Sequence, residues 1–185
     1  TYDARASIAP LAGLRAPLGV VAVLGNHDSR SALNRVALSS RDWAVAFSRI
    51  GITLLQDGVV RLGPLVIGGL KDIYTRKPDL PDTMTTMARM GGARLILSHG
   101  PDVFPALPNT PSLTLVGHTH CGQVALPFAG IVYVPSKYGT RYGCGLYRDG
   151  AKTMIVAAGI GTSGLPFRLL APPDIWLITI KPTPN

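Results

Sequence analysis

Two histidines separated by one residue lie where a predicted buried strand ends. His118 and His120 follow the apolar run 113–116 and belong to the segment Gly117–Gln123. Successive side chains of an extended strand point to opposite faces, so both imidazoles can approach one metal ion only if the chain bends, and we assign that bend to Gly117. A His-x-His pair alone is weak evidence for a metal site, because such short motifs are common.

The placement of the other histidines strengthens this interpretation. The chain contains four histidines, and each follows a hydrophobic run and a small residue. His27 comes after the run 20–24, and His99 comes after the run 95–97. In open α/β sheets, loops at the carboxyl ends of neighbouring strands gather ligands at one edge. We therefore expect the four positions to form one site.

One amide oxygen and three imidazoles are the candidate metal ligands of that site. They belong to Asn26, His99, His118 and His120. Mixed nitrogen and oxygen ligation favours Mn, Fe, Zn or Ni over Ca or Mg. His27 directly follows a predicted ligand, so we expect it in the same pocket as a catalytic residue, acting as a general acid on an alkoxide leaving group.

The elements expected around these residues alternate between strand and helix in the first part of the chain and are mostly strands in the last part. Helices are predicted over 29–38, over 43–50 with Asp42 as N-cap, and over 82–90 with Asp82 as N-cap. Strands are predicted over 20–24, 59–62, 65–67, 95–97, 113–116, 131–134, 145–147, 154–157 and 175–180. The pattern indicates a single α/β domain over 1–185, with α+β elements: a mixed sheet plus an antiparallel C-terminal sheet.

The bulk composition limits the classes of function. The 185 residues are 46% hydrophobic and carry a net charge of +8, which is typical of a globular protein that attracts anions. No nucleic-acid partner is expected, because the basic residues are dispersed and do not alternate with aromatic ones. No apolar run reaches the length of a membrane span. Because the chain begins at Thr1, we expect that the natural N-terminus, with any targeting segment, is missing.

Two further motifs have more than one interpretation. Nothing in the sequence requires Cys121 and Cys144 to form a disulfide. Cys121 adjoins a histidine and could be a metal ligand, although a structural role is favoured. The glycines of 159–164 match a dinucleotide-binding fingerprint, but Leu165-Pro166 stands where a helix should begin and no acidic residue follows at the required distance. A glycine loop near the metal site is the better interpretation.

The histidine motifs together resemble a known signature. Three segments resemble, in order and spacing, the second half of the signature of the calcineurin-like metallophosphoesterases: Gly25-Asn26-His27-Asp28, Ser98-His99 and Gly117-His118-x-His120. Three later segments resemble a narrower branch, the YkuE-like bacterial phosphoesterases: 136–141, 145–147 and 159–166. The resemblance covers nearly the whole chain and implies a four-layer αββα sandwich.

The resemblance also implies a mechanism. In that family two divalent metal ions lie side by side, and a bridging hydroxide attacks phosphorus in line. By motif, Asn26, His99 and His118 would bind the second metal and His120 the first, while His27 would assist the leaving group. The implied activity is a metal-dependent phosphoester or pyrophosphate hydrolase.

The sequence departs from the family in its first motifs. The family signature opens with Asp-x-His and Gly-Asp, which this chain lacks, so the domain is expected to be truncated by its first strands and to hold at most one metal ion well. Two hypotheses follow: a phosphoester hydrolase whose missing motifs lie outside this sequence, with this chain impaired by itself, and a catalytically incomplete relative that binds metal or anions.

The substrate is defined only by class. The resemblance admits a phosphorylated small molecule or a lipid-linked phosphoester, with peripheral association with a membrane, in a bacterial protein that is cytoplasmic or membrane-associated. Lys137 and Arg141 are either substrate-binding residues that contact phosphate or solvated loop charges.

Overall fold

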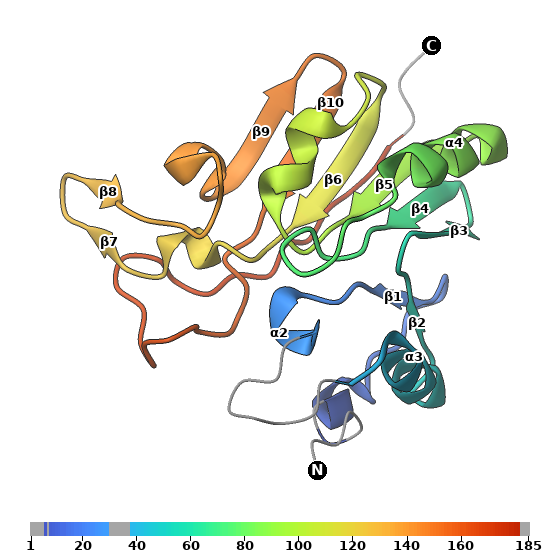
Figure 1. The fold of residues 1–185 in the computed structure, drawn as a ribbon, viewed down its shortest axis with the longest axis horizontal. Helices are drawn as coiled ribbons and strands as arrows, with labels where there is room; N and C mark the ends of the chain where they lie inside the picture. The colour runs from blue at the N-terminus through green and yellow to red at the C-terminus, as the bar shows by residue number, and fades with distance from the viewer. Residues whose placement is uncertain (1–5, 7, 30–37, 182–185) are drawn as a thin grey trace.

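Two β-sheets packed face to face form the middle of the structure, a computed structural model that describes residues 6, 8–29 and 38–181 (Figure 1). The α-helices are α2 (Asn26–Ser29), α3 (Ser40–Arg49) and α4 (Leu80–Met90), and the short 3-10 helices are η1 (Ala9–Leu11), η2 (Pro101–Ala106), η3 (His120–Gly122) and η4 (Gly139–Tyr142). The strands are β1 (Val20–Ala22), β2 (Ile52–Leu54), β3 (Gly58–Leu62), β4 (Leu65–Gly69), β5 (Ala93–Leu97), β6 (Ser112–Val116), β7 (Ala125–Leu126), β8 (Gly130–Ile131), β9 (Gly145–Asp149) and β10 (Lys152–Val156).

The larger sheet has six strands in the order β3-β4-β5-β6-β10-β9. The four central strands run parallel, and the outer strands β3 and β9 run antiparallel to their neighbours. The parallel strands are rich in Val, Ile and Leu because both of their faces are covered. The mixed sheet predicted from the sequence is therefore confirmed, and all four parallel strands end at the same edge.

The second sheet consists of β1 and β2, which pair in parallel. Leu55, Ile67 and Leu95 are buried between the two sheets, together with half-buried side chains from both. Trp43 and Phe47 of α3 cover the outer face of β1 and β2. The described part of the chain thus contains four layers, with α3 outside the small sheet and α4 and η2 outside the large one.

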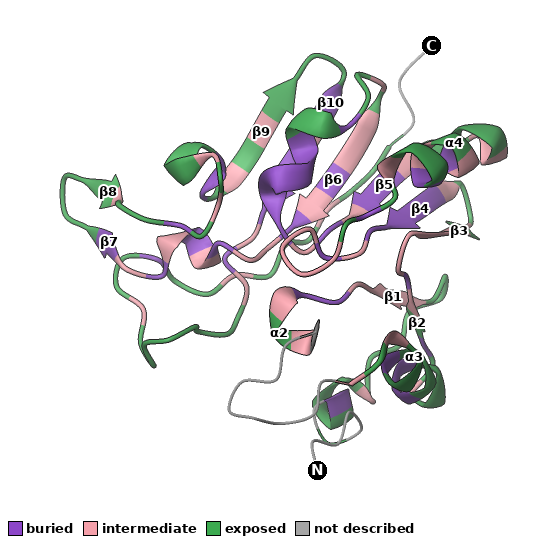
Figure 2. Cartoon of the chain, in the orientation of Figure 1, coloured by how far each residue is buried: buried purple, intermediate pink, exposed green. Residues whose placement is uncertain are grey.

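Helix α4 and η2 bury the outer face of the large sheet. Met87 of α4 and Phe104 of η2 belong to a cluster that includes Val66, Ile96 and Met154 from three strands. The buried positions of α3 and α4 lie on the sides that face the sheets (Figure 2). The α/β class and the αββα layering expected from the sequence are confirmed.

Both long helices begin earlier than predicted. Ser39, not Asp42, is the N-cap of α3, and the two residues form a capping box in which each side chain accepts a hydrogen bond from the other's backbone N–H. Asp79, not Asp82, is the N-cap of α4, and its carboxylate accepts the Asp82 N–H. In both cases the acidic residue expected to cap the helix lies in its first turn, where the helix dipole also favours it.

The last part of the chain contains less strand than predicted. Strands β9 and β10 form the expected antiparallel pair, but β10 also joins the large sheet beside β6. Of the predicted strand 131–134, only Ile131 belongs to β8, and 175–180 forms no strand. Strand β2 was not predicted. Most of the predicted helix 29–38 lies outside the described residues.

Candidate metal centre

Three of the predicted ligands meet at the carboxyl edge of the sheets. His99 follows β5 and His118 follows β6, and their segments are joined by a hydrogen bond from the Gly117 N–H to the His99 carbonyl. Asn26 begins α2 just after β1. The His99 Nε2 atom lies 2.9 Å from Asn26 Oδ1 and 2.9 Å from His118 Nδ1. Sequence reasoning therefore placed these three side chains together correctly.

The donor atoms of this trio fit a metal ion better than they fit one another. His118 Nε2 donates to the Pro135 carbonyl at 3.0 Å, so its Nδ1 presents a lone pair when the ring is neutral. His99 Nε2 then faces two acceptors, this nitrogen and the Asn26 oxygen, with one hydrogen at most. Two ligands at right angles around an ion about 2.1 Å away are separated by about 3.0 Å, close to the spacing seen.

Burial keeps the imidazoles in the neutral form that ligation requires. Removal from water, with the neighbouring His118 adding a smaller effect, lowers the pKa of His99 to about 4. Burial also lowers the pKa of His118 and of His120, and the charge of Arg168 contributes to the shift at His120. At neutral pH these nitrogens can therefore offer lone pairs to a cation.

The bend between the two histidines of the motif does not occur at Gly117 as predicted. His118 and His120 themselves adopt left-handed backbone conformations, with φ of 69° and 53°, and Cys121 and Gln123 do the same. Residues other than glycine rarely adopt this conformation, because their Cβ crowds the backbone. Such strain persists only where the surroundings enforce it, and it concentrates at functional sites.

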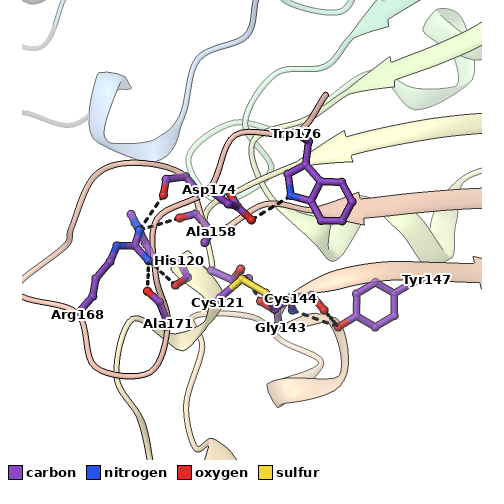
Figure 3. Close-up of a disulfide and its surroundings, with 12 residues drawn as sticks. His120, Cys121, Gly143, Cys144, Tyr147, Ala158, Arg168, Ala171, Asp174 and Trp176 are labelled. Carbon is purple, nitrogen blue, oxygen red and sulfur yellow. Dashed lines mark hydrogen bonds between the residues drawn. A yellow bond between two sulfur atoms is a disulfide. The ribbon is translucent and has the colours of Figure 1, made fainter. Parts of the chain in front are cut away.

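A disulfide enforces this conformation. Cys121 pairs with Cys144, and Cys121 is buried against Ala158 and Ala171 (Figure 3). The Thr119 hydroxyl donates to the Gly143 carbonyl at 2.8 Å, next to the same bridge. Sequence reasoning left the two cysteines as separate thiols and kept Cys121 as a possible metal ligand; the structure instead confirms its favoured structural role.

Arg168, which was not among the residues predicted for the site, links His120 to the C-terminal segment. Its guanidinium donates to the carbonyls of His120 (3.0 Å), Ala158 (2.8 Å) and Ala171 (3.1 Å), and its Nη2 lies 3.4 Å from His120 Nδ1 (Figure 3). A planar group with five N–H donors suits such a cluster of carbonyls. The glycine loop 159–164 also contacts this arginine, through Gly161, so that loop lies beside the site as predicted.

A cavity of about 520 Å³ contains the whole set of predicted catalytic and metal-binding residues. Its lining includes Asn26, His27, His99, His118 and His120. His27 is exposed there and approaches the cavity from α2. The convergence of these five residues, expected from their positions after strands, is what the structure shows.

The two predicted phosphate contacts lie outside this cavity. Lys137 is exposed and lines a neighbouring cavity of about 550 Å³, which shares Tyr133 and Pro135 with the first. Arg141 is exposed and lies over the ring of Tyr142, and it does not line either cavity. Lys137 therefore faces the neighbouring cavity, whereas Arg141 lies over an aromatic ring outside both cavities.

The protein ligands present are too few for two metal ions. In the described part of the chain, no group of three or more His, Cys, Asp or Glu side chains could hold a metal ion. The trio combines two imidazoles with one amide, and His120 lines the same cavity but contacts Arg168. Among the described residues, the trio therefore offers three donor atoms that one cation could share, and His120 offers one further imidazole.

Comparisons with known proteins identify relatives of this chain. The αββα layering and the polar site at the strand ends define the class, a layered α/β sandwich protein with a ligand site at the carboxyl edge of its sheets. The chain is 32% identical over 188 residues to the uncharacterized metallophosphoesterase YkuE of Bacillus subtilis, covering 99% of this chain and 64% of that protein. It is 33% identical over 181 residues to an uncharacterized metallophosphoesterase of Aquifex aeolicus, covering 92% and 64%.

A third relative is the phosphodiesterase YaeI of Escherichia coli, 28% identical over 168 residues, with 86% of this chain and 57% of that protein covered. No protein-family model matches the chain, and no solved structure matches it. The chain is similar over most of its length to proteins named metallophosphoesterases, a name that implies divalent metal ions, and this similarity supports the calcineurin-like resemblance of its histidine motifs. It spans less than two thirds of the length of these relatives.

Proposed function

We propose that this chain carries the second-metal half of a phosphoester hydrolase site. The observation that supports the proposal is the 2.9 Å spacing of the Asn26, His99 and His118 donor atoms at the ends of three strands. A divalent transition metal, Mn, Fe, Zn or Ni, would supply Lewis-acid activation of the phosphoryl group and of the attacking water. His120 would bind the first metal, whose other ligands we place in a part of the family domain that this chain does not span.

The other residues of the cavity have roles in binding and proton transfer. His27, exposed beside Asn26, holds the proton that the leaving oxygen takes up. His118 is fixed by its hydrogen bond to the Pro135 carbonyl and by the ring of Tyr74, stacked on it at 4.0 Å. Lys137 contacts the distal part of the substrate from the neighbouring cavity.

The test separates a hydrolase from an incomplete relative that binds metal without turnover. EDTA-treated protein is titrated with Mn²⁺ by calorimetry and assayed with bis(p-nitrophenyl) phosphate. We expect weak binding of one ion, lost in His99→Ala, and turnover that falls about 100-fold or more in His27→Ala while Mn²⁺ binding is retained. Binding without turnover would favour the incomplete relative, and absence of binding would contradict both.

The entrance of the cavity supports a substrate with an apolar part. Val132, Tyr133 and Leu165 line the cavity and are 55%, 71% and 53% exposed. Exposed apolar side chains next to a cationic Lys137 suit a lipid-linked phosphoester in an anionic membrane surface. No helix in the described ranges is long and apolar enough to cross a bilayer. The exposed apolar side chains beside Lys137 are the basis on which we propose peripheral membrane contact through this rim.

Sedimentation with vesicles tests the membrane contact. The protein should sediment with vesicles that contain phosphatidylglycerol, and a Val132→Ser, Leu165→Ser double variant should bind them at least about fivefold more weakly, because two apolar side chains are lost from the rim. Substitution of the exposed Leu146, on β9, by Ser is the control and should leave binding unchanged. Equal binding of all three proteins would show that this rim does not mediate contact with the membrane.

A further inference from the structure

Asp72 carries a buried carboxylate with one oxygen left without a hydrogen-bond partner. Its exposure is 2%. Oδ2 accepts hydrogen bonds from the Thr75 N–H at 2.9 Å and from the Thr75 hydroxyl at 2.7 Å, whereas Oδ1 is buried and has no partner among the described residues. A buried charge that is not compensated is costly, so a site that retains one usually uses it.

The sheet places this carboxylate beside the candidate metal ligands. Strand β4 lies next to β5, and the Leu70 N–H donates to the Leu97 carbonyl, so Asp72 emerges from its strand next to the segment that delivers His99. Two residues after Asp72, the ring of Tyr74 stacks on His118 at 4.0 Å. The same short loop thus supplies both the buried charge and the aromatic contact to a ligand.

Electrostatics agrees with this placement. The ligand trio itself is neutral, because it consists of an amide and two uncharged imidazoles. A divalent cation held by that trio would have no counter-charge among its own ligands, and Asp72 is a buried carboxylate in the loop that adjoins the segments of both imidazoles.

We propose that Asp72 is a positioning residue that provides the counter-charge for a cation held by Asn26, His99 and His118, and that it acts without ligating the ion. The inference rests on the proposed function. Asp72 does not join the ligand set, because no group of three acidic, histidine or cysteine side chains in the described ranges could hold a metal. The Oδ2 atom of Asp72 already accepts two hydrogen bonds from Thr75.

The variant Asp72→Asn tests this with two readouts of opposite sign. Asparagine keeps an oxygen for the Thr75 N–H but removes the buried charge. We therefore expect the thermal midpoint of the EDTA-treated protein to rise by about 3 °C, and the Mn²⁺ affinity measured by calorimetry to fall about 10- to 100-fold. A purely structural role would lower the midpoint and leave the affinity unchanged.

Asp57→Asn is the matched control, with the same change of net charge. The Asp57 carboxylate is paired with Lys71 at 2.9 Å and accepts the Lys71 N–H, so this variant should be less stable and bind Mn²⁺ as the wild type does. Unchanged Mn²⁺ affinity in Asp72→Asn, with binding intact in the wild type, would overturn this inference alone. Absence of binding by the wild type would overturn it together with the proposed function.

Discussion

Reduction of the Cys121–Cys144 disulfide should lower the free energy of unfolding by about 3 kcal/mol, the value expected for a bridge that closes a loop of this length. The two cysteines are 23 residues apart, and the bridge fixes the histidine loop to the segment before β9. Without it, the left-handed conformations of His118 and His120 lose a constraint, so Mn²⁺ affinity should fall as well. Urea unfolding and Mn²⁺ titration, each with and without reductant, measure both effects.

The double variant Cys121→Ala, Cys144→Ala is the control for this prediction. It should show the stability of the reduced protein and should not respond to reductant, because alanine fills part of the buried site beside Ala158 and Ala171 without forming a bridge. Alkylation without prior reduction should label neither cysteine, because both sulfur atoms belong to the bridge. Equal unfolding midpoints for oxidised and reduced wild type would show that the bridge contributes nothing.

The residues at the strand ends were predictable because a local pattern determines their position. His99 and His118 each follow an apolar run and a small residue, and parallel strands that neighbour one another deliver such residues to one edge. The order of the motifs along the chain then selected the family. The sequence therefore predicted that these site residues lie close together, although it says little about how the side chains around them pack.

The features that the sequence did not predict depend on contacts between distant segments. Pairing of Cys121 with Cys144 requires two loops to meet, and nothing in either loop indicates this. Arg168 is one of 18 basic residues, and only the folded chain shows that its guanidinium meets the carbonyl of His120. Asp72 likewise stands in a polar loop that gives no sign of burial.

Local sequence patterns also gave wrong predictions for two helix N-caps and one strand. Asp42 and Asp82 are good N-cap residues, but Ser39 and Asp79 stand three residues earlier and cap the helices instead. The apolar segment 175–180 has strand-like composition, yet a strand needs a neighbour with free backbone groups, and the structure gives this segment none among the described residues. Tertiary context decided both cases.

Replacing Gly25 by alanine should abolish most metal binding with a smaller effect on folding. A Cβ at Gly25 would lie 2.6–2.9 Å from three atoms of the His99 imidazole, so the ring must move. It can move toward the cavity of about 520 Å³ that it lines, which relieves the overlap but separates Nε2 from Asn26 and His118. We expect Mn²⁺ affinity to fall about 100-fold, with a loss of about 1–2 kcal/mol in the free energy of unfolding.

Gly117→Ala is the matched control, because the same methyl group there would approach nothing closer than the His99 carbonyl at 3.9 Å. It should bind Mn²⁺ within about twofold of the wild type by calorimetry, since ordinary van der Waals contact requires no shift. If both variants lost affinity equally, crowding of His99 would not be the cause. If Gly25→Ala bound Mn²⁺ normally, His99 would not be a ligand, because its nitrogen cannot keep its position beside a methyl group at Gly25.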